Sequence, residues 1–262
     1  MAILNIIFIG DVVGTPGKNA VRDNLPSLIK SMDVDLVLAN GENAASGLGL
    51  NLSSAQDLLD YGVDLISLGN HTWSKSEIFK FIEEEKNIIR PANVSQSWPG
   101  HGFTSINTSK GKLSFINLIG RVGMPPANCP FERAIEILEK LDKLGDGHMI
   151  IVDFHAEATS EKIALARYLD GKVSLVCGTH THVQTNDEKK LPKGTGYITD
   201  VGMTGPRDSV IGMEIKSSIR RFVDKLPQSY KIADGRPIFN AIFAKIDERS
   251  GRTLHIEKIN IE

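Results

Sequence analysis

The feature of this chain that most constrains its fold is a series of short apolar runs, rich in β-branched residues, that alternate with segments of helical periodicity. Apolar runs of this length predict strands, and the early ones are almost continuously apolar, which is typical of strands covered on both faces of a sheet. The predicted strands cover residues 3–9, 36–39, 65–68, 113–117, 149–154, 173–177, 196–199, 230–233, 239–246 and 253–259. Strands and helices in alternation predict the α/β class.

Capping residues and linker composition predict the helix starts and the domain organisation. Ser53-x-x-Gln56 has the spacing of a capping box, and Ser160 is placed to cap a later helix. Pro26 lies inside the first helical segment, where we expect a kink or a restart. The chain contains no internal repeat and no linker of low complexity, so we expect a single domain over residues 1–262.

The composition excludes several classes of protein. With 41% hydrophobic and 24% charged residues, the chain has an ordinary globular composition. A net charge of −2 without a basic tract argues against a surface for duplex nucleic acid, although charge gathered at one site could still attract phosphate. The apolar N-terminus is shorter than a membrane span and lacks the flanks of a leader. Cys129 and Cys177 form no Cys-x-x-Cys pair, which favours a reduced, cytoplasmic protein over one with a structural disulfide.

The sequence GDVVGTPGKN at residues 10–19 joins the first predicted strand to the first helix, and its glycines raise the question of phosphate binding. A phosphate-binding loop needs a glycine five positions before its Gly-Lys pair and a Ser or Thr after it. Val12 and Asn19 occupy those positions here, so this interpretation is disfavoured. Asp11 is left with two interpretations, a cap for the following helix or a residue that takes part in chemistry.

Polar residues follow the predicted strands at the point where each strand ends. Asp, Glu, Asn or His follows five of them, in the segments 10–11, 40–43, 69–71, 155 and 178–182. Because the carboxyl ends of parallel strands meet at one edge of an α/β sheet, we expect these side chains to converge there. Carboxylate, amide and imidazole groups without thiolate suit Mn, Fe or Zn, and they are too many for one tetrahedral zinc. Two metal ions that share a carboxylate such as Glu42 would use them.

Each of these residues also has a structural interpretation when it is taken alone. The asparagines are common turn residues, and single histidines such as His71 and His155 are more often structural than metal-ligating. His180 and His182 are harder to explain in this way. A spacing of two on an extended segment places both imidazoles on one face, and burying them without partners is costly.

These motifs, taken in order, resemble the YmdB-like branch of the calcineurin-like metallophosphoesterases. They are GD after the first strand, GEN, GNHTW, DFHAEATSEK, GTHTHVQT and ITDVGMTGP, between Gly10 and about Gly212. The resemblance implies an α/β fold of the four-layer αββα sandwich type and two transition-metal ions, Fe or Mn first and Zn or Mg as alternatives. It implies hydrolysis of phosphodiesters, 2′,3′-cyclic nucleotides such as 2′,3′-cAMP above all, with an indirect link to RNA turnover. We also expect a homo-oligomer that does not associate with membranes.

The resemblance further implies a role for each candidate residue. The ligands of the first metal ion would be Asp11, Glu42 and His182, with Asn43 at or beside it. Glu42 would bridge to a second ion, whose other ligands would be Asn70, His155 and His180. A hydroxide that bridges the ions would attack the phosphate, and His71 would assist the leaving group. The first motif reads Gly-Asp-Val-Val where the wider superfamily has Gly-Asp-x-His, and Glu42 stands where Asp is usual; the YmdB-like branch shares both departures, and the metal identity stays open.

Other functions and further contacts stay open at this point. A non-catalytic regulator could keep the same metal site to sense a nucleotide or phosphate, and a metal-dependent amide or ester hydrolase would need the same ligands. A phosphate-loop nucleotide hydrolase is the weakest of the alternatives. The segment 199–208 is expected to form a loop near the site, where Thr204 or Arg207 could contact substrate; a purely structural loop is an equal alternative.

Overall fold

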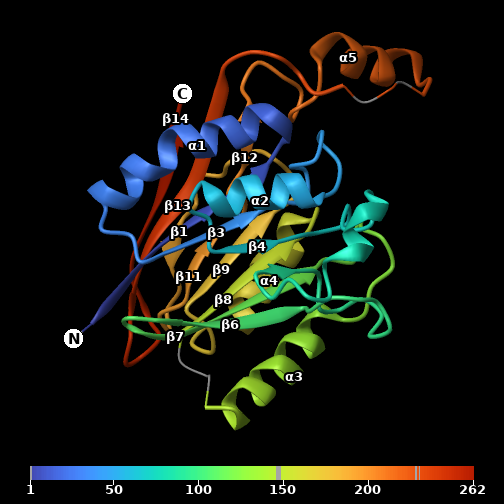
Figure 1. Cartoon of the computed structure of the whole chain (residues 1–262). Coiled ribbons are helices and arrows are strands. Elements are labelled where there is room, and N and C mark those ends of the chain that lie inside the picture. Colours follow the sequence, from blue (N-terminus) through green and yellow to red (C-terminus); the bar gives the residue numbers. More distant parts are fainter. Residues whose placement is uncertain (1, 146–148, 228, 230) are drawn as a thin grey trace.

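The computed structural model describes residues 2–145, 149–227, 229 and 231–262, and its strands form two sheets (Figure 1). The first sheet has the strand order β2, β12, β13, β1, β3, β4, β5, and β14 pairs with β13. Its strands are β1 (Ile3–Ile9), β2 (Asp11–Val12), β3 (Leu36–Asn40), β4 (Leu65–Ser67), β5 (Ile88–Ile89), β12 (Met203–Pro206), β13 (Pro237–Asp247) and β14 (Thr253–Ile261). The strands β1, β3, β4 and β5 run parallel, and β13 lies antiparallel between β1 and β12.

The second sheet has the strand order β10, β11, β9, β8, β7, β6, and its four central strands are parallel. Its strands are β6 (Phe103–Thr108), β7 (Gly111–Ile119), β8 (Met149–His155), β9 (Leu175–Thr179), β10 (Lys189–Lys190) and β11 (Gly196–Ile198). The helices are α1 (Gly14–Ser31), α2 (Leu52–Asp60), the short 3₁₀ helix η1 (Ser76–Lys80), α3 (Pro130–Lys143), α4 (Thr159–Tyr168) and α5 (Ile215–Asp224).

Apolar cores separate the sheets and helices into four layers (Figure 1). On the outer face of the first sheet, α1 and α2 pack through residues that include Leu25 and Leu58. Between the sheets, Phe8 meets Phe115 edge to face, with ring centroids 5.9 Å apart. On the outer face of the second sheet, α3 and α4 bury residues that include Leu141 and Leu165. This order of layers confirms the predicted αββα sandwich.

One predicted strand does not form, five observed strands (β2, β5, β6, β10 and β12) were not predicted, and two predicted helix caps are wrong. Of the predicted strand 230–233, Tyr230 lies outside the described residues, and Ile232 makes only an isolated bridge with Met213. The cap of α2 is Asn51, whose side chain accepts a hydrogen bond from the Ser54 backbone, so Ser53 is not the cap. Likewise, Ala158 precedes α4 without a side-chain cap, which makes the prediction for Ser160 wrong.

Pro26 lies within α1, which continues through it without a restart. Buried Val21 and Leu25 hold the helix on the sheet before the proline, and the partly buried Leu28 and Ile29 hold it afterwards. Packing on both sides therefore outweighs the hydrogen bond that a proline removes.

The helix α5 differs from the other helices because it stands away from the sandwich (Figure 1). None of its described side chains is buried, and Phe222 is 76% exposed. Among the described residues, no helix is both long enough and apolar enough to cross a membrane.

Candidate metal centre

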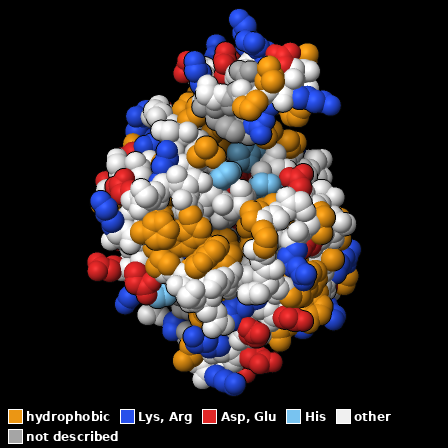
Figure 2. All heavy atoms as spheres, turned by 90° about the vertical axis from the view of Figure 1, so that its right-hand side faces the viewer, with side chains coloured by type: hydrophobic (Ala, Val, Ile, Leu, Met, Phe, Trp, Pro, Cys, Tyr) orange, Lys and Arg blue, Asp and Glu red, His pale blue; other side chains and the backbone are white. Residues whose placement is uncertain are grey.

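The carboxyl ends of both sheets meet at one edge, and the candidate ligands lie at that edge. The first sheet supplies residues that follow β1, β3 and β4, namely Asp11, Glu42, Asn43, Asn70 and His71. The second sheet supplies His155 at the end of β8 and His180 and His182 directly after β9. Histidine side chains reach the surface on this face, next to the projecting α5 (Figure 2). The site therefore depends on both sheets.

One group of potential ligand atoms surrounds a common point. Ligand atoms of Glu42, His155 and His180 all lie within 4.8 Å of one another. Glu42 Oε1 lies 3.0 Å from His155 Nε2, and His180 Nδ1 lies 3.1 Å from the same nitrogen. Asn70 Oδ1 approaches that nitrogen to 2.9 Å. The carboxylate, amide oxygen and imidazoles together make a ligand set that suits a transition-metal ion.

A second group lies beside the first and includes an unsatisfied carboxylate oxygen. Asp11 Oδ1 is 3.8 Å from His182 Nε2 and 3.9 Å from His155 Nδ1. This oxygen is buried and has no hydrogen-bond partner among the described residues. Since burying a charged oxygen without a partner is costly, this arrangement fits a cation at Asp11.

Asn43 contacts both groups of side chains, through Glu42 of the first and His182 of the second. Its amide nitrogen lies 3.3 Å from His182 Nε2 and 3.4 Å from Glu42 Oε1. A metal ion binds an amide through oxygen, so a ligand role for Asn43 requires its amide to turn by half a rotation. This requirement makes Asn43 the weakest of the predicted ligands.

The three clustered histidines each have one ring nitrogen held by a partner outside the cluster. His155 Nδ1 lies 3.0 Å from the Thr179 hydroxyl, which itself donates to Asp153. His180 Nε2 lies 3.2 Å from Glu157 Oε2. His182 Nδ1 lies 2.8 Å from a backbone carbonyl oxygen. Partners of this kind fix the tautomer and turn the other nitrogen of each ring toward a metal.

Charge within the cluster holds a proton on His155 when metal is absent. Burial lowers the pKa of His155, but the Glu42 and Asp11 carboxylates outweigh burial and raise this pKa to about 9. Burial raises the pKa of Glu42, and the charge and hydrogen bond of His155 outweigh it and lower this pKa to about 2. Burial and the charge of His155 lower the pKa of His180 to about 3. A metal ion bound to this cluster would displace the proton from His155.

A match to a family adds to this geometry. A model of the YmdB-like protein family covers residues 7–259. The chain belongs to the YmdB-like family. A 2′,3′-cyclic-nucleotide 2′-phosphodiesterase of Bacillus subtilis (strain 168) is 45% identical over 258 residues, which are 98% of this chain and 97% of the relative.

Solved structures agree with this membership. The crystal structure of a phosphatase from Mycoplasma pneumoniae superposes with a TM-score of 0.94 at 36% identity, over 100% of this chain and 94% of that one. A 5′-nucleotidase from Staphylococcus aureus superposes with a TM-score of 0.63 at 14% identity, over 98% of this chain and 54% of that one. At that identity the second comparison shows a shared fold alone.

In this YmdB-like chain, Lys18 of the glycine-rich segment 10–19 is paired with residues of α2. Lys18 Nζ lies 2.6 Å from Asp57 Oδ2 and 3.4 Å from Ser54 Oγ, so its ammonium group ties α1 to α2. No side-chain cap holds the start of α1, which removes the alternative role of Asp11 as its cap. Both alternatives to a metal-binding Asp11 are therefore disfavoured.

The two candidate substrate contacts, Thr204 and Arg207, each have partners within the protein. Thr204 is fully buried in β12, where its hydroxyl donates to the Asn240 carbonyl and accepts from the Asn240 N–H. Pairing of β12 with β13 takes Thr204 into the sheet, which favours the structural alternative for this residue. The Arg207 guanidinium lies 2.7 Å from the Glu262 carboxylate in an exposed ion pair. This partner gives Arg207 a structural role at the chain end.

Sequence reasoning missed a buried ion pair beneath the histidine loop of this YmdB-like site. Lys162 and Asp200 are both fully buried, and Lys162 Nζ lies 2.6 Å from Asp200 Oδ2. Asp200 Oδ2 also accepts hydrogen bonds from the backbone N–H and the hydroxyl of Thr181, at 3.1 and 2.7 Å. Thr181 lies between His180 and His182 in the sequence. His180 and His182 have positive φ angles of 98° and 65°, which non-glycine residues rarely adopt. The ion pair thus helps to hold the loop in a strained form.

Replacing Lys162 by methionine is expected to lower the free energy of unfolding by about 3–5 kcal/mol, because it leaves the Asp200 charge buried without its partner. Denaturant titration of the metal-free protein measures this loss. Arg220→Met is the matched control, since the Arg220–Asp224 pair is exposed and should contribute less than about 1 kcal/mol. Equal losses in the two variants would contradict the structural role of Lys162.

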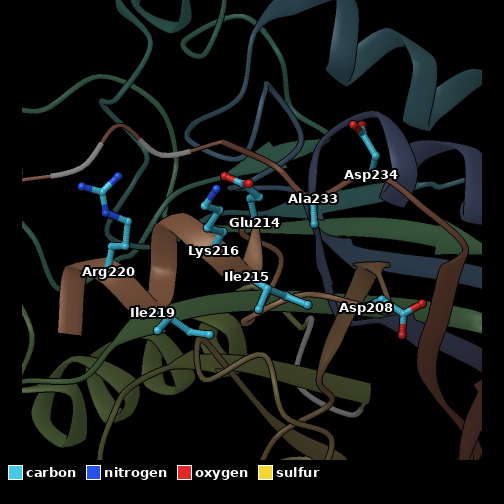
Figure 3. A pocket seen from close by; sticks show the side chains of 8 residues that line it. All are labelled: Asp208, Glu214, Ile215, Lys216, Ile219, Arg220, Ala233 and Asp234. Atoms are coloured by element: carbon cyan, nitrogen blue, oxygen red, sulfur yellow. The ribbon is translucent and has the colours of Figure 1, made fainter. Parts of the chain in front are cut away.

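A wide cavity of about 590 Å³ lies under α5 and is separate from this YmdB-like metal centre. Figure 3 shows side chains around it from α5 and from the neighbouring segments, among them Glu214, Ile219, Arg220 and Asp234. None of the candidate metal ligands lines it. The cavity is therefore not the place where we expect phosphate chemistry.

Proposed function

We propose that this protein is a metal-dependent phosphodiesterase that holds two transition-metal ions and hydrolyses 2′,3′-cyclic nucleotides. The observation that carries the proposal is the convergence of Glu42 and the inward-facing histidine nitrogens beside the unsatisfied oxygen of Asp11. The named activity of the Bacillus subtilis relative supports the choice of substrate.

The ligands proposed for the metals are Asp11, Glu42, Asn43 and His182 on one side and Glu42, Asn70, His155 and His180 on the other. Metal ions bound there supply Lewis-acid polarisation of the phosphoryl group and lower the pKa of water. The carboxylates of Asp11 and Glu42 would balance the charge of the ions, and Thr179 and Glu157 would keep the imidazoles of His155 and His180 in the binding tautomer.

In the hydrolysis itself, water adds to phosphorus, one bond from phosphorus to a ribose oxygen breaks, and that oxygen takes up a proton. His71 is the residue that we propose for this proton transfer. Its backbone N–H donates to Glu42 Oε2 at 2.9 Å, and its Nδ1 lies 3.3 Å from the Ser74 hydroxyl. These contacts hold the imidazole at the edge of the cluster, where we propose that it acts as a general acid.

The metal stoichiometry tests this proposal. The fully loaded protein is expected to hold about two transition-metal ions per chain, measured by elemental analysis. A chelator should abolish hydrolysis of 2′,3′-cAMP, and Mn²⁺ or Fe²⁺ should restore it. Full activity with a single ion per chain would contradict the two-metal site, and binding of 2′,3′-cAMP without product release would indicate a sensor.

A further inference from the structure

A second, smaller cavity adjoins the metal centre at Asn70. It has a volume of about 60 Å³, room for several water molecules, and Gly69 and Asn70 form part of its wall. Gly69 also touches the cluster, because a Cβ built there would lie 2.3 Å from His155 Cδ2 and 2.4 Å from Glu42 Oε2. One stretch of backbone therefore has the candidate ligands on one side and this cavity on the other.

The remaining wall of the cavity is aromatic and apolar. We call this cavity the tryptophan pocket. Besides Gly69 and Asn70, its lining residues include Trp73, Val94, Trp98, Ile119, Pro125 and Pro126. The Trp73 and Trp98 rings meet edge to face at 5.5 Å, and Trp98 is 41% exposed. On the molecular surface, hydrophobic side chains gather on the same face as the histidines (Figure 2). A wall of this kind suits a flat, weakly polar ring.

Arg90, the charged residue in the lining of the tryptophan pocket, forms hydrogen bonds within the protein. Arg90 is buried, and its guanidinium donates to the carbonyl oxygens of Pro91, Trp98 and Pro99 at 2.9, 2.8 and 2.8 Å. These bonds use one N–H on each of its three nitrogens, so Arg90 fastens the Trp98 segment. The rest of the lining is mostly apolar and suits a flat ring better than a phosphate group.

The part of the wall that includes Ile119 is also held by hydrogen bonds. The Asn93 side chain donates to the carbonyl oxygens of Ile119 and Asn128, both at 2.8 Å, and accepts from the Ile119 N–H at 2.9 Å. Walls fixed in advance lower the entropic cost of ordering a ligand between them. The pocket is thus built before any ligand arrives.

We propose that the nucleobase of the substrate stacks on the partly exposed Trp98 ring of the tryptophan pocket while the cyclic phosphate lies at the metal centre. This proposal rests on the proposed function and gives it a determinant of specificity: Trp98 would supply a stacking surface for the base. Stacking of a base on an aromatic side chain tolerates every base, because each has a flat face. The pocket would therefore select nucleotides over diesters without a base, and it would discriminate weakly among the bases.

The test uses the Mn²⁺-loaded protein and two probes, adenosine 3′-monophosphate and inorganic phosphate, with binding measured by titration calorimetry. Trp98→Ala is expected to weaken binding of the nucleotide about 10-fold and to leave binding of phosphate unchanged. Trp98→Phe keeps a ring and should recover most of the loss. The matched control is Phe79→Ala, since Phe79 stacks on Trp73 at 4.9 Å in the same aromatic cluster but does not line the pocket.

Kinetics provide a second comparison. The same Trp98→Ala variant should raise KM for 2′,3′-cAMP about 10-fold and leave kcat/KM for glycerol 1,2-cyclic phosphate, which has no base, unchanged. Unaltered binding of the nucleotide, or an equal loss for nucleotide and phosphate, would overturn the proposal. If the protein cleaves no phosphodiester and still binds the nucleotide through Trp98, the proposed function fails and the base pocket stands.

Discussion

Replacing His71 by alanine is expected to lower kcat for 2′,3′-cAMP by about 10²- to 10⁴-fold while the protein keeps its metals and its melting temperature. The departing ribose oxygen is a poor leaving group that needs a proton, and the imidazole at the cluster edge is placed to supply it. Its ring is held by Ser74 and its backbone by Glu42, so the metal ligands should not move when the ring is removed. Steady-state kinetics, elemental analysis and thermal unfolding on the same variant measure all three quantities.

The size of this loss should depend on the leaving group. With a p-nitrophenyl phosphodiester, the departing phenolate needs no proton, and the loss should shrink toward unity. His255→Ala is a suitable control, because His255 is an exposed histidine on β14 paired with Glu257. Loss of the metals together with the activity would make His71 a ligand. An unchanged kcat would make it a packing residue.

Replacing Glu42 by glutamine is expected to weaken metal binding by about 100-fold or more, beyond the effect of removing an outer partner of a ligand. Glu42 is 1% exposed, and its two oxygens face His155 and the His71 N–H at 3.0 and 2.9 Å. The glutamine keeps the shape of the side chain and removes the charge that would balance both proposed ions. Metal content after identical dialysis of variant and parent protein measures the difference.

Asn43→Ala is the matched comparison for Glu42→Gln, because Asn43 is the neighbouring residue and is 3% exposed. It removes at most one neutral ligand, whose amide must first turn to offer its oxygen. We therefore expect Asn43→Ala to retain more metal than Glu42→Gln. If the two variants retain equal amounts, Glu42 does not bridge the ions.

The candidate ligands were predictable because each follows an apolar strand directly in the sequence. Where a run such as 149–154 ends in His155, the position of the imidazole depends on local sequence and on the direction of a parallel strand. The αββα arrangement came from the family resemblance, since strand and helix periodicity alone predict only the α/β class. The cap predicted at Ser53 failed because α2 begins earlier, at Leu52, where the Asn51 side chain accepts from the Ser54 N–H.

What could not be predicted depends on contacts between distant parts of the chain. Glu157 orients His180, and Lys162 neutralises Asp200, only after the second sheet and α4 have packed together. Asp153 left the clearest signal, a carboxylate within an apolar strand run, and the structure gives it hydrogen bonds from Ser67 and Thr179. The burial of Thr204 in the sheet could not be predicted, because the pairing of β12 with β2 and β13 has no local signature.

The position of β13 has a consequence for the order in which this protein is made. Every candidate ligand lies between residues 11 and 182, whereas β13 spans Pro237–Asp247 and lies between β1 and β12 in the finished sheet. Asn240 in β13 accepts the Gly10 N–H through its carbonyl oxygen at 3.0 Å, one residue before Asp11. During synthesis on the ribosome, all of the candidate ligands therefore emerge before β13, the strand whose backbone holds the residue next to Asp11. The nascent chain therefore contains every candidate ligand early. The ligands reach their final arrangement only when the strands after residue 236 have been translated.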